Sequence, residues 1–179
     1  MHHLKLATAR GKYPRADDYF NLIAKQDGFR KIDAVTDVLP GDIIAVKYHV
    51  GATGQCSSCE NSGHVMMVDD IPTLRKKDTM PIVSGTKQWE VLIIDSTMGS
   101  HGTNDTRYRK KGSKIGGVGR GILRLYSDAD GKIIGYSWST LEKTVYHSST
   151  SRPLVVGRVL CYASTATVGK DIVPAGSNR

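Results

Sequence analysis

Residues 39–48 read LPGDIIAVKY, an apolar run rich in β-branched side chains that is entered through a Pro-Gly-Asp turn. Two further runs have the same character, GHVMMV at residues 63–68 and VLIIDST at residues 91–97. Short runs of this kind, bounded by turn residues, are typical of strands that are half or fully buried in a sheet. Together they predict a sheet at the centre of the fold.

Two of these predicted strands carry a polar residue that a purely structural strand does not need. His64 stands at the start of the second run, and Asp95 lies near the end of the third. If the sheet pairs these strands, the carboxylate can orient the imidazole as a general base for a thiol or hydroxyl nucleophile. A strand-edge histidine with a satisfied hydrogen bond is the alternative. His64 and Asp95 are therefore our candidate catalytic residues.

The flanking segments predict one helix and more strands. Residues 15–26 predict a helix, because Pro14 precedes them and Gly28 follows their end. Residues 122–126 and 132–138 predict a β-hairpin, because an Asp-Gly turn separates them. Tyr136 and Trp138 alternate with Ser137 in the second of these strands, and we expect them to pack in the core. With a last short strand at residues 158–162, we expect five or six strands and an N-terminal helix packed on them. This is an α+β domain with an antiparallel sheet.

The length of 179 residues suits one buried core. We assign residues 14–162 to a single domain, with a disordered or truncated end at 1–13 and a flexible tail at 163–179. No apolar run approaches the roughly 18 to 20 residues that cross a bilayer, and the start does not resemble a secretory signal. We expect a monomer without a transmembrane segment. Its location stays open, and it is exported or in the cell envelope if residues upstream of Met1 hold a signal.

The formal net charge of +8 favours anionic partners. The excess is concentrated at residues 75–77 and 107–114. These clusters lack the interleaved aromatic residues of nucleic-acid binding surfaces, so we do not expect nucleic acid as a partner. A solvated basic surface and an anionic polymer such as cell-wall material both remain compatible with them.

The three cysteines allow at most one intramolecular disulfide bond. Cys56 and Cys59 form a Cys-x-x-Cys motif in a polar insertion at residues 51–62. A structural zinc site needs four ligands, and only His49 and His64 lie nearby in the sequence. A local disulfide or two free thiols are the better interpretations. We predict neither a metal nor another cofactor.

Residues 98–121 are dense in Gly, Ser, Thr and basic residues, which is typical of substrate-binding loops. Within them we select His101, Asp105 and Arg107 as candidates for binding a peptide carboxylate or a sugar. A loop stabilised by local turns explains the same residues. The glycines at 116–121 do not predict a nucleotide site, because they enter a strand rather than leave one and open a helix.

The segments LPGDII at 39–44, GHVMMV at 63–68 and IDS at 94–96 together resemble the NlpC-type papain-like cysteine peptidases. The resemblance places His64 at the catalytic histidine and Asp95 at the position that orients it. It implies a papain-like α+β fold and a thiol hydrolase that cleaves amide bonds in peptidoglycan peptides. It runs from about residue 14 to 160 and includes less specific segments, found in a subgroup of bacterial members, at residues 101–107, 117–121 and 135–138.

The chain departs from that family at the nucleophile. The family's cysteine opens a helix in an Asp-Cys-Ser-Gly-Phe-like motif, and this sequence contains no such motif. Cys56 and Cys59 stand in a predicted loop, and Cys161 in a predicted strand, at a place that suits circularly permuted relatives. We therefore expect a fragment whose nucleophile lies upstream. The alternatives are a catalytically inactive domain that binds cell-wall peptides or a protein partner, and thiol chemistry at Cys161.

Overall fold

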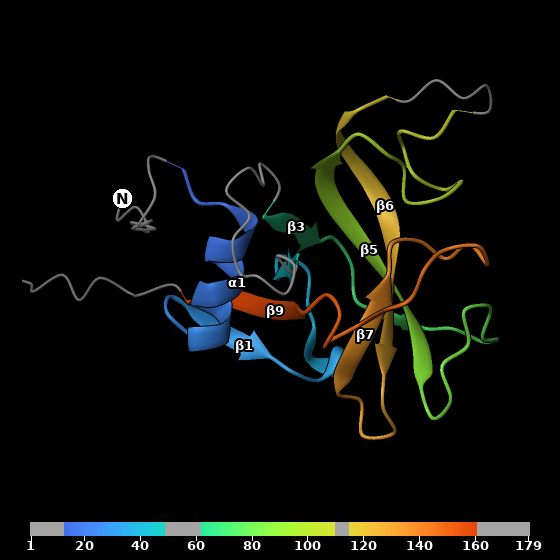
Figure 1. Ribbon diagram of the computed structural model, residues 1–179, viewed down its shortest axis with the longest axis horizontal. Coiled ribbons are helices and arrows are strands. Elements are labelled where there is room, and N and C mark those ends of the chain that lie inside the picture. Colours follow the sequence, from blue (N-terminus) through green and yellow to red (C-terminus); the bar gives the residue numbers. More distant parts are fainter. Residues whose placement is uncertain (1–12, 49–61, 110–114, 161–179) are drawn as a thin grey trace, which may run out of the picture.

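The computed structural model describes residues 13–48, 62–109 and 115–160 (Figure 1). These residues form one α-helix, one short 3-10 helix and nine strands. In chain order the elements are α1 (Ala16–Lys25), β1 (Phe29–Ile32), η1 (Val35–Asp37), β2 (Ile43–Lys47), β3 (Gly63–Val68), β4 (Thr73–Leu74), β5 (Lys87–Thr97), β6 (Gly117–Ser127), β7 (Ile133–Ser137), β8 (His147–Ser148) and β9 (Leu154–Val159).

All nine strands belong to one antiparallel sheet. Its order is β1-β9-β2-β3-β5-β6-β7-β8, and β4 pairs with β5 outside this path. The predicted α+β, papain-like fold with five or six strands is therefore wrong, because the described chain is almost entirely antiparallel sheet with a single helix. The strands that the sequence did not predict are short ones such as β1, β4 and β8. A strand of two to four residues is too short to show an alternation of apolar and polar residues. These strands are defined by their pairing with longer neighbours.

The strands predicted from the three apolar runs are present as β2, β3 and β5, and the predicted hairpin is formed by β6 and β7. The helix α1 also occurs where the sequence indicated it. Within the described residues, no helix is long and apolar enough to cross a membrane. The last strand begins four residues earlier than expected, at Leu154.

The turn before β2 fastens that strand to its neighbour β9. The Asp42 carboxylate accepts a hydrogen bond from the backbone N–H of Leu39 at 2.9 Å and another from Nε of Arg158 at 2.8 Å. Gly41, with φ of +89°, donates its N–H to the carbonyl of Val68 at 2.8 Å. A glycine suits this left-handed conformation, in which other residues are strained. The Pro-Gly-Asp turn thus fixes where β2 starts relative to both of its neighbours.

The strand β2 is buried on both faces, which explains why its sequence is continuously apolar rather than alternating. Ile44 and Val46 enter the main core, where they join side chains of β3, β5, β6 and β7. On the opposite face Ala45 packs in a smaller cluster with Ile23 of α1. The helix lies close to β9, because a Cβ atom at Gly157 would come within 2.7 Å of the Ile23 side chain.

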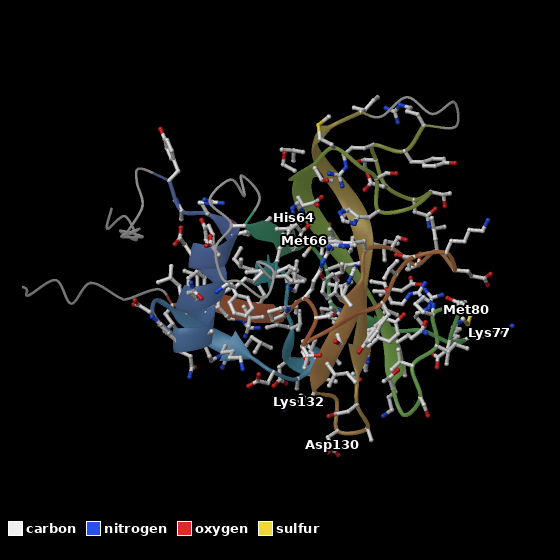
Figure 2. All side chains as sticks on the ribbon, in the orientation of Figure 1. His64, Met66, Lys77, Met80, Asp130 and Lys132 are labelled. Carbon is white, nitrogen blue, oxygen red and sulfur yellow. The ribbon has the colours of Figure 1, made fainter. Side chains whose placement is uncertain are left out.

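A buried arginine lies on the face of β6 opposite the main core and binds the segments that cover this face. The Arg124 side chain is fully buried, and its Nη1 donates to the carbonyls of Thr79 at 3.1 Å and Met80 at 2.8 Å. Its Nη2 donates to the carbonyl of Leu141 at 3.1 Å. Within the described residues no carboxylate pairs with Arg124, so backbone carbonyls compensate its charge. Met80 lies at the side of the molecule away from α1 (Figure 2).

We expect Arg124→Ala to lower the free energy of unfolding by about 3 kcal/mol, because it removes a fully buried side chain together with its hydrogen bonds to the carbonyls of Met80 and Leu141. The control is Arg120→Ala on the same strand, where an exposed side chain pairs with Asp69. That exposed pair contributes below about 1 kcal/mol. Urea unfolding curves measure both values, and equal losses in the two variants would contradict a structural role for Arg124.

Candidate functional site

The site lies where the two halves of the sheet meet. The strands β3 and β5 pair at only two positions, Met67 with Ile94 and Val68 with Ile93. In Figure 1 the strands β1 and β9 run across the view, whereas β5, β6 and β7 run nearly at right angles to them. On one side the N–H of Asp69 donates to the carbonyl of Leu92 at 2.8 Å, and on the other side, toward His64 and Asp95, the ladder between β3 and β5 ends. Side chains from both strands can therefore fill the space beside this junction.

His64 and Asp95 occupy positions that face the core. Successive residues of a strand point to opposite faces, so residues two apart share a face. On β3 the residue two positions after His64 is Met66, which is buried in the main core (Figure 2). On β5 the residue two positions before Asp95 is Ile93, also in the core. Each polar residue thus continues an apolar stripe, and this pattern brings both to the same side of the sheet.

The two candidate catalytic side chains form a direct hydrogen bond. Nε2 of His64 lies 2.6 Å from Oδ2 of Asp95. The carboxylate is fully buried, and the imidazole is partly exposed. An ionised carboxylate only accepts hydrogen bonds, so Nε2 of His64 carries the proton. In the neutral imidazole Nδ1 then holds a lone pair, and no described residue forms a hydrogen bond with it.

A second histidine binds the same carboxylate oxygen. Nε2 of His101 lies 2.8 Å from Oδ2 of Asp95, and its Nδ1 lies 2.6 Å from the carbonyl oxygen of Trp138. Burial alone would lower the pKa of His101, but its hydrogen bond to Asp95 and the negative charge there raise it overall. The His101 side chain is almost completely buried.

An arginine and a second carboxylate complete the network. Nη2 of Arg107 donates to Oδ1 of Asp95 and to Oδ2 of Asp105, each at 2.7 Å, and its Nε donates to Oδ1 of Asp105 at 2.9 Å. Asp105 also accepts the backbone N–H of His101 at 2.8 Å. Bonds of this kind between charged groups are stronger than those between neutral groups. These hydrogen bonds hold the loop that carries His101, Asp105 and Arg107 against β5.

The network keeps both carboxyl groups ionised. Burial alone would raise the pKa of Asp95, but hydrogen bonds from His101, His64 and Arg107 hold it well below its usual range. The pKa of Asp105 is also lowered, because its bond to Arg107 outweighs the effect of burial. The pKa of Arg107 is raised, chiefly by its bond to Asp105.

The residues predicted to bind substrate all lie in this network. Asp105 and Arg107 are buried and bonded to each other, while His101 lines the pocket described below. Substrate binding by these residues stays a prediction, and their contacts favour a supporting role for Asp105 and Arg107. The sequence analysis selected Asp105 and Arg107 together, as residues of one loop. It did not predict their contact with Asp95 on β5.

A pocket of about 250 Å³ lies over the two histidines. The indole ring of Trp138 forms part of its wall, with its centroid 5.5 Å from that of His64 and 5.9 Å from that of His101. We expected Trp138 and Tyr136 to pack in the core. Tyr136 is fully buried there and Trp138 packs against it, but Trp138 also faces the site. The lining residues are Tyr48, His64, Thr97, Gly99, Ser100, His101 and Trp138.

Two glycines of β6 make room for the network. Gly119 and Gly121 lie on the face of β6 that carries Leu123 and Leu125 further along, where large side chains would otherwise stand. A Cβ atom at Gly119 would come within 2.4 Å of Nε of Arg107. The glycine-rich run at 116–121 thus has a packing role that its sequence did not show.

The distances between the ligating atoms fit shared protons better than a metal ion. Nε2 of His64, Nε2 of His101 and Oδ2 of Asp95 all lie within 4.8 Å of one another. The 2.6 and 2.8 Å contacts to Oδ2 are shorter than the about 3.0 Å between neighbouring ligands of an octahedral ion at a usual bond length. Arg107 also places a positive charge on the same carboxylate. The Cys56–Cys59 motif, His49 and Cys161 lie outside the described residues.

The chain is similar in sequence to a protein of a virus. The chain is 37% identical, over 153 residues, to an uncharacterized protein of Acanthamoeba polyphaga mimivirus. The alignment covers 83% of this chain and 65% of the viral protein. This chain therefore spans about two thirds of its relative's length. No family model and no solved structure matches the chain, so the resemblance to the NlpC-type peptidases stays an interpretation of the sequence.

We expect Gly121→Ala to destabilise the fold by about 1 to 3 kcal/mol, because its methyl group would stand 2.6 Å from Oδ2 of Asp105 and 2.8 Å from Cβ of His101. Gly99→Ala is the matched control, since a methyl group there meets nothing within 4 Å. Urea unfolding measures both. If the Gly121→Ala protein were as stable as the Gly99→Ala protein, the close packing of Gly121 against Asp105 and His101 would not matter for stability, and the expectation would be wrong.

The raised pKa of His101 makes its contribution to stability depend on pH. Below the unfolded-state value, near 6.5, the full contribution is present, and it is lost as the pH rises through the higher pKa of the folded state. The unfolding free energy of the wild type minus that of His101→Gln should therefore fall as the pH rises above about 6.5. The opposite shift of His147 is common to both proteins and cancels in the difference. A difference independent of pH would refute this expectation.

Proposed function

We propose that the pocket is the general-base half of a thiol hydrolase that cleaves amide bonds. The observation that carries this proposal is the 2.6 Å hydrogen bond between His64 and Asp95 beside the pocket. It holds the imidazole with Nε2–H directed at the carboxylate, so Nδ1 is the atom that can accept a proton from a nucleophile.

The reaction follows from these positions. Nδ1 of His64 takes the proton of a cysteine thiol, and the thiolate sulfur forms a bond to the amide carbon. The C–N bond then breaks, and the imidazolium returns the proton to the departing amine. Water, deprotonated by the same nitrogen, hydrolyses the thioester and releases the acid and the thiol. Asp95 remains ionised throughout and stabilises the imidazolium between these steps.

The nucleophile and the substrate are the parts of the proposal that rest on the sequence. All three cysteines of the chain lie outside the described residues, so the described residues supply the base and its carboxylate but not the nucleophile. A pocket of about 250 Å³ is smaller than typical sites for drug-sized ligands, and it suits one amino-acid side chain or a short acyl group. Peptidoglycan peptides are the substrate class that the NlpC resemblance implies.

The second candidate is a catalytically inactive domain that uses the pocket to bind cell-wall peptides or a protein partner. It is favoured by the same aromatic wall of Tyr48 and Trp138, which a binding site also uses. A binding domain does not need Nδ1 of His64 as a base. The two candidates therefore differ in what His64→Ala does.

The test incubates purified muropeptides with the longest natural form of the chain, including any residues encoded upstream. We expect His64→Ala to lower the cleavage rate by at least about a hundredfold. The control is His147→Ala, because His147 contacts Tyr136 and Trp138 but does not line the pocket. Cleavage that persists in His64→Ala, or binding of muropeptides without cleavage, would overturn the hydrolase proposal, and the second result supports the binding domain.

A further inference from the structure

His101 lies between two hydrogen-bond acceptors. The carbonyl oxygen of Trp138 can only accept, so Nδ1 of His101 must donate to it across 2.6 Å. Oδ2 of Asp95 lies 2.8 Å from the other ring nitrogen, Nε2. A neutral imidazole carries one N–H and would therefore place a lone pair against one of these oxygens. Only the imidazolium form donates to both.

The other arrangement moves the proton to the carboxyl group. Oδ2 of Asp95 would then donate to Nε2 of His101 while still accepting from His64. That arrangement leaves a neutral acid beside Arg107, whose Nη2 lies 2.7 Å from Oδ1, and it gives up a buried ion pair. Removing one charge from such a buried pair is strongly unfavourable. The carboxylate with an imidazolium is therefore the favoured state.

We propose that His101 is an imidazolium that anchors Asp95 in the position from which this carboxylate orients His64. His101 is a positioning residue, because both of its nitrogens are engaged and it acts through Asp95. The inference deepens the proposed function, and rests on it, in that it concerns the same site and takes His64 as the base.

The charges around His101 balance when it is an imidazolium. The titratable or charged side chains that face it are Asp95 on β5, His64 on β3, Arg107 and Asp105 on its own loop, and, beyond the Trp138 ring, His147 with Arg152. With His101 charged, the two carboxylates and the two nearest cations are equal in number. His101 therefore holds the Asp95 carboxylate in the place where it also accepts the Nε2–H of His64.

The test is ¹⁵N NMR of the histidine side chains in the 179-residue chain at pH 7. In the wild type we expect both ring nitrogens of His101 to show protonated shifts, and His64 to show a single tautomer with the proton on Nε2. In His101→Leu, which removes both donors, we expect the His64 ring nitrogens to show shifts averaged over the two tautomers. His147→Gln is the control and should leave the His64 tautomer as in the wild type.

Each outcome decides a different part. A His101 ring with one unprotonated nitrogen at pH 7 overturns the charged state, and it does so in the wild type even if His101→Leu does not fold. A His64 tautomer that is unchanged in a folded His101→Leu protein overturns the positioning role. Both readouts are independent of cleavage, so a charged His101 in a protein that cleaves nothing would refute the proposed function and leave this inference standing.

Discussion

The carboxylate of Asp95 is the group on which the site depends. It is fully buried and accepts hydrogen bonds from two imidazoles and one guanidinium. A buried carboxylate without such partners would be costly, and with them it is a fixed point to which three separate chain segments are attached. Arg107 and Asp105 stabilise the loop over β5, and His101 connects that loop to the carbonyl of Trp138. His64 connects β3 to the same carboxylate. The arrangement of the site therefore depends on the negative charge of Asp95.

The sequence predicted the parts of this structure that have a local signal. The apolar runs around Ile44, Met66 and Ile93 gave three strands, and the Asp-Gly turn gave the hairpin. His64 and Asp95 were selected because a purely structural strand does not need a polar residue there, and the structure brings them into contact. Their role as base and orienter is still a proposal. The fold class was wrong, because the number and order of the strands depend on pairings between distant segments such as β1 with β9.

The features that the sequence did not reveal are contacts between elements. Gly121 looked like a flexible residue of a loop, yet its missing side chain is the space that Asp105 occupies. Trp138 was assigned to the core on its alternation with Tyr136, although one edge of the ring forms the pocket wall. Arg124 stands between Leu123 and Leu125 in a predicted strand, and its sequence gave no indication that backbone carbonyls would accept its hydrogen bonds. Each of these roles depends on a neighbour more than ten residues away in the chain.

The short ladder between β3 and β5 has a mechanical consequence. Two residue pairs and the hydrogen bond from the N–H of Asp69 to the carbonyl of Leu92 connect the two parts of the sheet there. The bond from His64 to Asp95 crosses the same junction on the side where the backbone ladder has ended. A region with few backbone bonds opens at a low free-energy cost. The His64–Asp95 bond therefore also contributes to holding the two parts of the sheet together.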